Sequence, residues 1–323
     1  MSGLRAVYRK ELEDHFSSVR FILLMTVILM VSLITAYMVG SGLRKDLEGL
    51  VRPSMVFLLL FTSTGPLLSL AQFIAFFGPI IGMVLGFDAI NRERANRTLS
   101  KVVSQPIYRD AVINGKFLAG ITVIAIMLVA ILLLISGLGL RVLGVVPGWE
   151  EVARLAVYLL ISIVYIGFWL GVAILCSVLF RGIATSALAT LALWIFFVFF
   201  MALGAKLVAE AARPLPPEGS SDYFGAAVAH VELQRSVSLL SPIQLYDEAT
   251  RIILNPMRNT NDPLASMRWG PLERLSMSRF QNPLPLGQSA LIVAPHLVSL
   301  LAITLVCFGI CYAAFMRQEI RST

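Results

Sequence analysis

The sequence predicts an all-α membrane protein with six transmembrane helices. Hydrophobic residues make up 58% of its 323 positions and charged residues only 14%, whereas charged residues average about 25% of a soluble domain. Six apolar stretches are long enough to cross the bilayer, because a helix needs about 20 residues to span a hydrocarbon layer of roughly 30 Å. The mean hydropathy of +0.83 agrees with this class. These observations exclude an ordinary soluble fold.

An amphipathic helix is expected first, over residues 3–17. Its apolar side chains share one helical face: Leu4, Val7, Tyr8, Leu12 and Phe16. Charged side chains occupy the opposite face, a pattern typical of a helix that lies in the membrane interface. A solvated helix that leads into the first span has the same pattern and is the alternative. The acidic residues of this segment argue against a cleavable signal peptide, so we expect it to be retained.

Five spans are expected within residues 21–205, and a sixth at residues 290–316. The first five ranges are 21–40, 67–87, 117–140, 155–180 and 184–205. The apolar stretch 55–66 is too short to cross the membrane, and its final Gly-Pro pair would interrupt a helix continuing into the second span. We expect this stretch to be partly buried or interfacial.

The basic residues of the short loops indicate the orientation. Most of them fall in segments that lie inside if the N-terminus is inside, and basic loops stay in the cytoplasm. We therefore expect a multi-pass protein of the cell (inner) membrane, surrounded by lipid, with both termini cytoplasmic. This topology accounts for the net charge of +7, so nucleic acid is not an expected partner.

Glycine recurs at four-residue spacing in two of the expected spans. Gly78, Gly82 and Gly86 share one face of the second span, and Gly167 and Gly171 share one face of the fourth. A face without side chains lets another helix approach closely. The spacing leaves open whether that helix belongs to the same chain or to a second subunit.

Residues 206–289 are expected to form an extracytoplasmic segment with short helices. Within it, Ser241 is a candidate N-cap, Pro242 a first helical residue and Gln244 the second member of a capping box. Tyr246 falls on the apolar face, so this outer helix should rest on the membrane or on neighbouring spans. The methionines that follow form no cluster, and no metal site is expected.

The sequence carries no catalytic motif. HExxH and GxSxG are absent, and the Gly115-Lys116 pair lacks both the earlier glycine and the following Ser/Thr of a phosphate-binding loop. The apolar stretches also hold no acidic or basic side chain of the kind that ion-driven transporters use. We therefore do not expect an enzyme, and any uphill transport must be driven by a partner protein.

A run of charge between the second and third spans, residues 91–116, contrasts with the apolar stretches around it. A short helix is expected over residues 91–105, with Leu99 and Val102 apolar, basic residues exposed, and Pro106 ending it. A cytosolic partner could bind such a helix. The alternative is a loop whose basic residues only hold it inside the cell.

The order of residues in this loop resembles the signature of type-2 ABC export permeases, in which an acidic residue and Thr-Leu precede a Pro, an Arg and a Gly-Lys. The corresponding residues are Glu93, Thr98, Leu99, Pro106, Arg109, Gly115 and Lys116. The most similar subgroup is the permeases that resemble the one serving copper-site maturation of nitrous oxide reductase. The similarity covers the whole layout, but Asn96 stands where the family often has Gly, and the outer segment is longer than usual.

This resemblance implies a single permease domain, residues 1–323, that forms a homodimer and works with two ATPase subunits. ATP and Mg would be bound by the ATPase, and no cofactor by this chain. The helix at 91–105 would be a coupling helix seated in the ATPase, with the N-terminal helix beside it. The implied contact residues are Arg92, Glu93, Arg94, Arg97, Thr98, Leu99, Lys101, Val102, Pro106 and Arg109.

Two other functions remain open from the sequence. The long outer segment also suits a membrane anchor that docks a secreted protein without transporting anything. A membrane-embedded enzyme or channel is a weaker alternative, because neither a catalytic constellation nor a polar pore stripe is visible. The exporter hypothesis itself allows an extracytoplasmic protein as a further partner.

Overall fold

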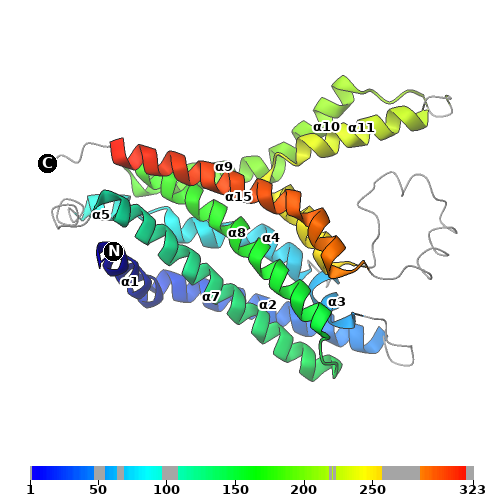
Figure 1. Ribbon diagram of the computed structural model, residues 1–323, viewed down its shortest axis with the longest axis horizontal. Coiled ribbons are helices and arrows are strands. Elements are labelled where there is room, and N and C mark those ends of the chain that lie inside the picture. Colours follow the sequence, from blue (N-terminus) through cyan, green and yellow to red (C-terminus); the bar gives the residue numbers. More distant parts are fainter. Residues whose placement is uncertain are drawn as a thin grey trace.

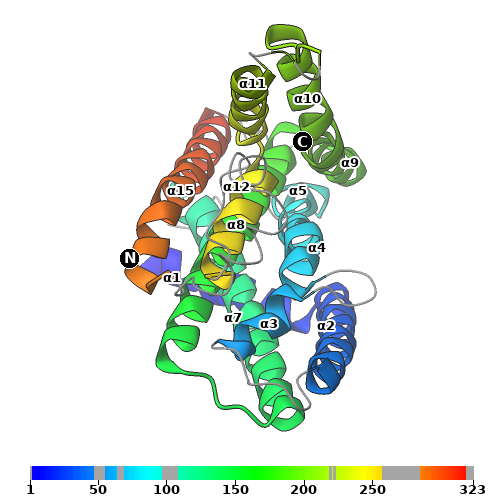
Figure 2. The same ribbon diagram turned by 90° about the vertical axis from the view of Figure 1, so that its right-hand side faces the viewer.

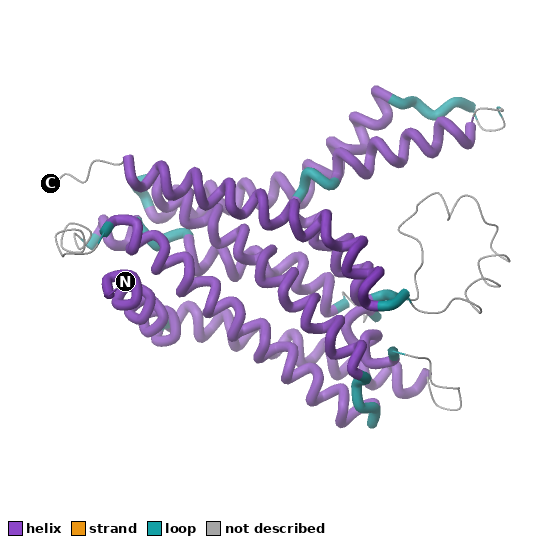
Figure 3. The backbone as a smooth tube through the Cα atoms, viewed as in Figure 1, coloured by secondary structure: helices purple, strands orange, loops and turns teal. Residues whose placement is uncertain are grey.

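The computed structural model describes residues 2–46, 55–63, 69–96, 108–217, 220, 223–256 and 284–317. Across these residues the chain is helical and contains no strand (Figures 1 and 3). Six of the described helices are long and apolar enough to cross a membrane. The predicted fold class is therefore confirmed.

The N-terminal helix α1 (Ser2–Ser17) lies against the first and third spans. A single non-helical residue, Ser18, separates it from α2 (Val19–Asp46), so the chain bends sharply before it enters the bundle. The third span is α7 (Arg109–Leu143). Figure 1 shows α1 beside the end of α7 that also lies near α5 (Asn91–Ala95). We call this end of the bundle the α5 end.

The short apolar stretch before the second span is more buried than we expected. It forms α3 (Val56–Thr62), in which Phe57 and Leu60 are both fully buried. The backbone N–H of Phe57 donates to the Glu151 carboxylate at 3.0 Å, which satisfies one of the free N–H groups at the start of this helix. The stretch is thus an internal helix of the bundle.

The second candidate span, Leu70–Ala95, begins with α4 (Leu70–Gly86), and its polar residue Gln72 lies in the first turn. The Gln72 and Ser69 side chains bond each other's backbone N–H groups at 3.0 and 3.2 Å. This reciprocal capping box fixes where the span begins. At the other end, α5 follows closely and ends at Ala95 with Asn96 as its C-cap, so only the first part of the helix expected at 91–105 lies among the described residues.

The fourth span, α8 (Trp149–Leu179), is the centre of the bundle. It packs against α4, α7, α12 (Pro242–Leu254) and the sixth span, α15 (Leu286–Arg317). Its Arg154 is fully buried and donates to the carbonyl of Ile253 at 3.0 Å, to the Leu284 carbonyl and to Ser289 Oγ at 3.2 Å. One guanidinium therefore joins α8 to the end of α12 and to the start of α15.

The fifth span leaves the bundle before the chain returns. It consists of α9 (Ile183–Ile195), a π-helical turn η1 (Phe196–Phe200) and α10 (Met201–Ala212). Helix α11 (Tyr223–Ser238) runs back beside α10, and this pair projects away from the other helices (Figures 1 and 2). Helix α12 then packs between α8, α15 and α4.

Candidate functional site

A buried cluster of charged side chains joins three helices at the α5 end. Lys116 of α7 is 5% exposed, and its Nζ lies 2.7 Å from Oε1 of Glu11 in α1 and 2.9 Å from Oε1 of Glu93 in α5. Lys10 makes longer contacts with the same two carboxylates, at 3.6 and 3.7 Å. We call these four residues the Lys116 cluster. One cation on α7 thus holds both α1 and α5.

Burial makes the members of the Lys116 cluster depend on one another. An isolated buried charge is very unfavourable, so Lys116, Glu11 and Glu93 each need their partners for compensation, whereas Lys10 is 56% exposed. Burial by itself would raise the pKa of Glu11, but the charge and the hydrogen bond of Lys116 outweigh it and lower that pKa below its ordinary value. Glu11 is therefore ionised at neutral pH, as the pairing requires.

The residue before Lys116 lets α1 approach α7 closely. A Cβ atom on Gly115 would lie 2.8 Å from Cγ1 of Val7 and 3.3 Å from the backbone nitrogen of Tyr8. Six residues farther along α7 from Lys116, the Thr122 hydroxyl lies 3.0 Å from the Tyr8 hydroxyl. The Gly-Lys pair therefore has a structural role: the glycine makes room for α1, and the lysine pairs with its carboxylate.

Helix α5 is also attached to the end of α8. The Ser177 hydroxyl of α8 accepts hydrogen bonds from the backbone N–H groups of Ile90 and Asn91, at 2.9 and 3.1 Å. It thereby satisfies N–H groups at the start of α5 that have no partner within that helix. The side-chain amide of Asn91 donates to the carbonyl of Gly182, just before α9, at 3.2 Å. A displacement of α5 would therefore act directly on α7, α8 and the start of α9.

The residues expected to contact an ATPase occupy different environments. Glu93 is buried in the Lys116 cluster, whereas Arg92 is exposed. The Arg94 guanidinium donates to the Val178 carbonyl at 3.3 Å, and Arg109 is the half-buried first residue of α7. The other expected contact residues lie outside the described part of the chain: Arg97, Thr98, Leu99, Lys101, Val102 and Pro106.

Two residues of this site did not emerge from the sequence. Glu11 follows Val7 by one helical turn, so it points to the apolar face of α1. A carboxylate on an otherwise apolar face signals a buried cation, and this signal could have identified Glu11. Ser177 gives no such signal, because a serine in an apolar span resembles a small packing residue.

The glycines of α4 bring its backbone against that of α8. A Cβ atom on Gly82 would lie 2.6 Å from the carbonyl oxygen of Ile166, and one on Gly86 would lie 2.9 Å from the carbonyl oxygen of Leu170. Gly78 faces the Ile166 side chain, at 3.0 Å. Both backbones would have to separate if side chains were introduced here.

The two glycines of α8 face other neighbours. A Cβ atom on Gly167 would lie 2.6 Å from Cδ1 of Ile121, and one on Gly171 would lie 3.7 Å from the Phe117 ring, both on α7. All five glycines therefore pack against helices of the same chain. This is one of the two arrangements that their spacing allows.

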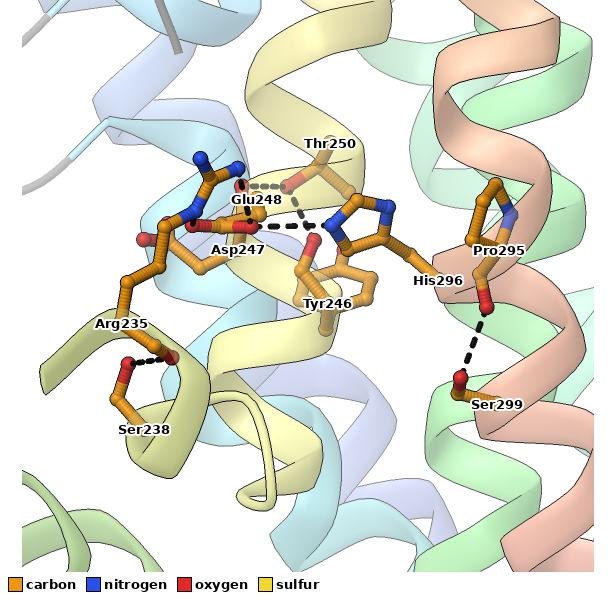
Figure 4. Close-up of polar contacts among 9 residues, drawn as sticks. All are labelled: Arg235, Ser238, Tyr246, Asp247, Glu248, Thr250, Pro295, His296 and Ser299. Atoms are coloured by element: carbon orange, nitrogen blue, oxygen red, sulfur yellow. Dashed lines mark hydrogen bonds and ion pairs between the residues drawn. The ribbon is translucent and has the colours of Figure 1, made fainter. Parts of the chain in front are cut away.

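A second polar cluster lies away from the α5 end, where α11, α12 and α15 meet (Figure 4). Oε1 of Glu248 in α12 lies 3.0 Å from Nε of Arg235 in α11, and Oε2 lies 3.0 Å from Nε2 of His296 in α15. We call these three residues the Glu248 cluster. The sequence alone places Glu248 outside the spans, whereas here it pairs with a residue of the sixth span. A carboxylate on α12, a helix outside the spans, therefore contacts a side chain of the sixth span.

Helix α12 places an aromatic side chain deep between the spans. The Tyr246 ring is fully buried and stacks on Tyr165, near the middle of α8, with ring centroids 4.3 Å apart. Its hydroxyl lies 2.8 Å from Ser162 Oγ, and the Tyr165 hydroxyl donates to the Ala75 carbonyl of α4 at 2.8 Å. This chain of contacts connects α12, α8 and α4.

The start of α12 differs in one detail from the expectation. Ser241 is the N-cap residue and Pro242 the first helical residue, as predicted. The capping box with Gln244 is not formed, because the Ser241 hydroxyl donates instead to the carbonyl of Phe197 in η1 at 3.2 Å. A tertiary contact has replaced the local one, and it fixes the start of α12 against the π-helical turn of the fifth span.

The chain matches the model of a known protein family. The family model described as "ABC-2 family transporter protein" matches residues 5–320 of the chain. No curated protein matches it. The matched range includes most of α1, all of α5 and α12, and every residue of both polar clusters.

Proposed function

The chain belongs to the ABC-2 transporter family, and we propose that it is the permease subunit through which a separate ATPase drives export. Membership covers nearly the whole chain, so the protein is a membrane-spanning component of an ABC transporter and not its ATPase. We propose in addition that the transporter exports its substrate, and that the segment beginning with α5 couples the chain to the ATPase. The observation that supports them most directly is the Lys116 cluster.

The Lys116 cluster suits the transmission of force. An ATPase that pushes on α5 would also move α1 and α7, because Lys116 binds Glu11 and Glu93 at 2.7 and 2.9 Å. The hydroxyl of Ser177 connects the same helix to α8, which is the centre of the bundle. Rigid helices then carry a displacement at one end to the other.

The proposed assembly has two copies of this chain and two ATPase subunits, which bind ATP and Mg. Both termini and α5 would face the cytoplasm of a cell (inner) membrane. The exposed Arg92, together with Arg97, Leu99 and Val102, would contact the ATPase. The proposed class of work is export, or mechanical work on an extracytoplasmic partner, as in the subgroup resembling the copper-maturation permease.

The test is permease-dependent ATP hydrolysis after reconstitution with a candidate ABC ATPase from the same genome. Reversing the charge at Arg92 and Arg97 to glutamate should lower the stimulated rate at least tenfold, because like charges brought together across an interface cost several kcal/mol and each 1.4 kcal/mol is about a factor of ten. Arg44→Glu is the matched control, since Arg44 is an exposed residue in the last turn of α2, away from the α5 end. It should leave the rate unchanged.

The opposite result would favour the anchor function. If no ATPase associates with the chain, or if the double reversal retains the full rate, coupling through this loop is wrong. If the protein is an anchor for a secreted protein, deleting residues 257–283 should abolish its function, and inactivating the ATPase should leave that function intact. If it is a transporter, inactivating the ATPase should abolish its function.

A further inference from the structure

A cavity of about 630 Å³ lies at the α5 end. It is lined by α1, the start of α2, the last turn of α4, and α5. Cavities of roughly 300–1,000 Å³ are typical of small-ligand sites. Four basic and four acidic side chains line it: Lys10, Arg20, Arg92, Lys116, Glu11, Asp14, Asp88 and Glu93. His15 also lines it, and burial lowers the pKa of this imidazole, so that it is neutral at pH 7. The lining therefore carries no net charge.

The charges of this lining are not equally engaged. Lys116 is buried between its two carboxylates, and Arg20 lies 3.1 Å from Asp88. The Lys10 ammonium lies 3.6–3.7 Å from the carboxylates of Glu11, Asp14 and Glu93, longer contacts than those of Lys116, and the side chains of Lys10 and Asp14 are 56% and 59% exposed. Arg92 has no carboxylate within 4 Å among the described residues. Arg92, Lys10 and Asp14 are thus the groups that can exchange solvent for a ligand.

These three groups define the chemistry of the ligand. A guanidinium and an ammonium together bind a phosphate well, because their hydrogen bonds to its oxygens are charge-assisted. Asp14 accepts hydrogen bonds from a primary ammonium. A ligand that carries both a phosphate and an ammonium would preserve the neutral balance of the lining, whereas a ligand with phosphate alone would leave excess negative charge.

The surface beside the cavity indicates where such a ligand comes from. Val19 lines the cavity and is 69% exposed, and Ile22 and Leu23 of the next turn of α2 are 50% and 60% exposed. An apolar stripe on a membrane-spanning helix faces lipid chains. A soluble phosphate compound would gain nothing from this stripe, but a lipid whose head group occupies the cavity would lay its acyl chains along it.

We propose that this cavity binds the head group of one phospholipid of the phosphatidylethanolamine type. Its phosphate lies on Arg92 and Lys10, its ammonium on Asp14, and its acyl chains run along the exposed side of α2. The Lys116 cluster forms part of the cavity wall, so the lipid would contact both α1, through Lys10 and Asp14, and α5, through Arg92. This inference rests on the membrane setting of the family and does not require the proposed coupling role of α5.

The test is lipid retention by the purified chain without any ATPase. The chain is reconstituted in nanodiscs of equal parts phosphatidylethanolamine, phosphatidylglycerol and phosphatidylcholine, and the lipids that remain bound after release are counted by native mass spectrometry. We expect one retained phosphatidylethanolamine per chain. Arg92→Gln and Asp14→Asn should each lower its retention roughly tenfold, the usual cost of losing a charge-assisted hydrogen bond.

Two variants on the same helix provide the matched control. Arg9 and Glu13 form an exposed pair on α1, with side chains 82% and 68% exposed, and neither lines the cavity. Arg9→Gln and Glu13→Gln should retain the lipid fully. Because Arg92 and Asp14 are themselves exposed, their variants should fold, and an unchanged melting temperature verifies this.

Three outcomes would overturn the proposal. Equal retention of phosphatidylglycerol or phosphatidylcholine would reject the zwitterionic primary-amine head group. Unchanged retention by the Arg92 and Asp14 variants would reject the cavity as the site. Displacement of the lipid by glycerophosphoethanolamine at equal concentration would show that the acyl chains contribute nothing and that the ligand is soluble. Lipid retention is measured without the ATPase, so these outcomes do not decide ATP-dependent coupling. Because Arg92 takes part in both proposals, Arg97→Glu alone is the variant that tests coupling independently of the lipid.

Discussion

The Lys116 cluster and the Glu248 cluster have opposite charge arrangements. In the first, one cation binds two carboxylates on different helices; in the second, one carboxylate binds an arginine and a histidine on different helices. Each joins three helices, but the Lys116 side chain is 5% exposed, whereas those of Glu248 and Arg235 are 23% and 34% exposed. The first suits a permanent joint, and the second suits a contact that can open.

The surroundings of the two clusters also indicate that the Lys116 cluster is permanent and that the Glu248 cluster can open. Beside Lys116, close packing of α1 on α7 at Gly115 and the Tyr8–Thr122 contact support the ion pairs. Helix α11 packs chiefly on α10, and the Arg235–Glu248 pair joins it to α12. We therefore expect α1, α5 and α7 to move together, and α11 to separate from α12 much more readily.

Lys116→Met should have the largest effect. It leaves the carboxylates of Glu11 and Glu93 buried without their main counter-ion, which costs about 3–5 kcal/mol for a broken buried pair. The measurement is the melting temperature of the detergent-solubilised chain. Lys10→Met is the control: this side chain is 56% exposed, so its removal should cost less than about 1 kcal/mol. Equal losses in the two variants would mean that Lys116 is not the centre of the joint.

Gly115→Ala should come next, because it tests the packing that supports the Lys116 cluster. The new Cβ would meet Val7 Cγ1 at 2.8 Å, and such overpacking costs about 1–3 kcal/mol. Gly137→Ala in the same helix has open space around its Cβ and should be neutral or stabilising by up to about 1 kcal/mol, since Ala favours a helix. The comparison uses thermal unfolding of both variants. A neutral Gly115→Ala would show that α1 is held by charge alone.

Glu248→Gln should have a smaller effect on stability and a local effect on mobility. The pairs of Glu248 are partly exposed, so their loss should cost on the order of 1 kcal/mol. Hydrogen exchange should become faster in α11 and remain unchanged in α1 and α5. Glu232→Gln, at an exposed position of α11, should leave exchange as it is. Faster exchange across the whole bundle would contradict the separable contact proposed for α11.

The smallest effect is expected from pH. Hydrogen bonds from His296 and Arg235 outweigh burial and lower the pKa of Glu248, just as Lys116 lowers that of Glu11. A lowered carboxyl pKa contributes stability above the unfolded value of about 4.3, and this contribution is lost as pH falls through the folded value. The difference in the free energy of unfolding between the native chain and Glu11→Gln should therefore be constant above about pH 5. Below that pH the difference should shrink towards zero. A difference that shrinks on raising the pH would reject this assignment.

The spans could be predicted because hydropathy is a local property. The expected third span, 117–140, lies within α7 (Arg109–Leu143), and the expected sixth, 290–316, within α15 (Leu286–Arg317). Both helices are longer than predicted, since a helix can continue with polar residues after it leaves the apolar stretch, and hydropathy registers only the apolar part. The spacing of the glycines predicted a face for close packing but could not name its partner.

Sequence by itself determined the all-helical class, the six spans, the glycine faces and the charged loop with its Glu93 and Lys116. Each follows from composition or from spacings within one helix. Only the tertiary structure decided that Glu11 meets Lys116 across 105 residues, that Ser241 bonds Phe197 instead of capping its own helix, and that Glu248 pairs with His296 of the sixth span. The physical reason is that hydropathy and helical periodicity describe neighbours along the chain, whereas a buried charge selects its partner by proximity in space.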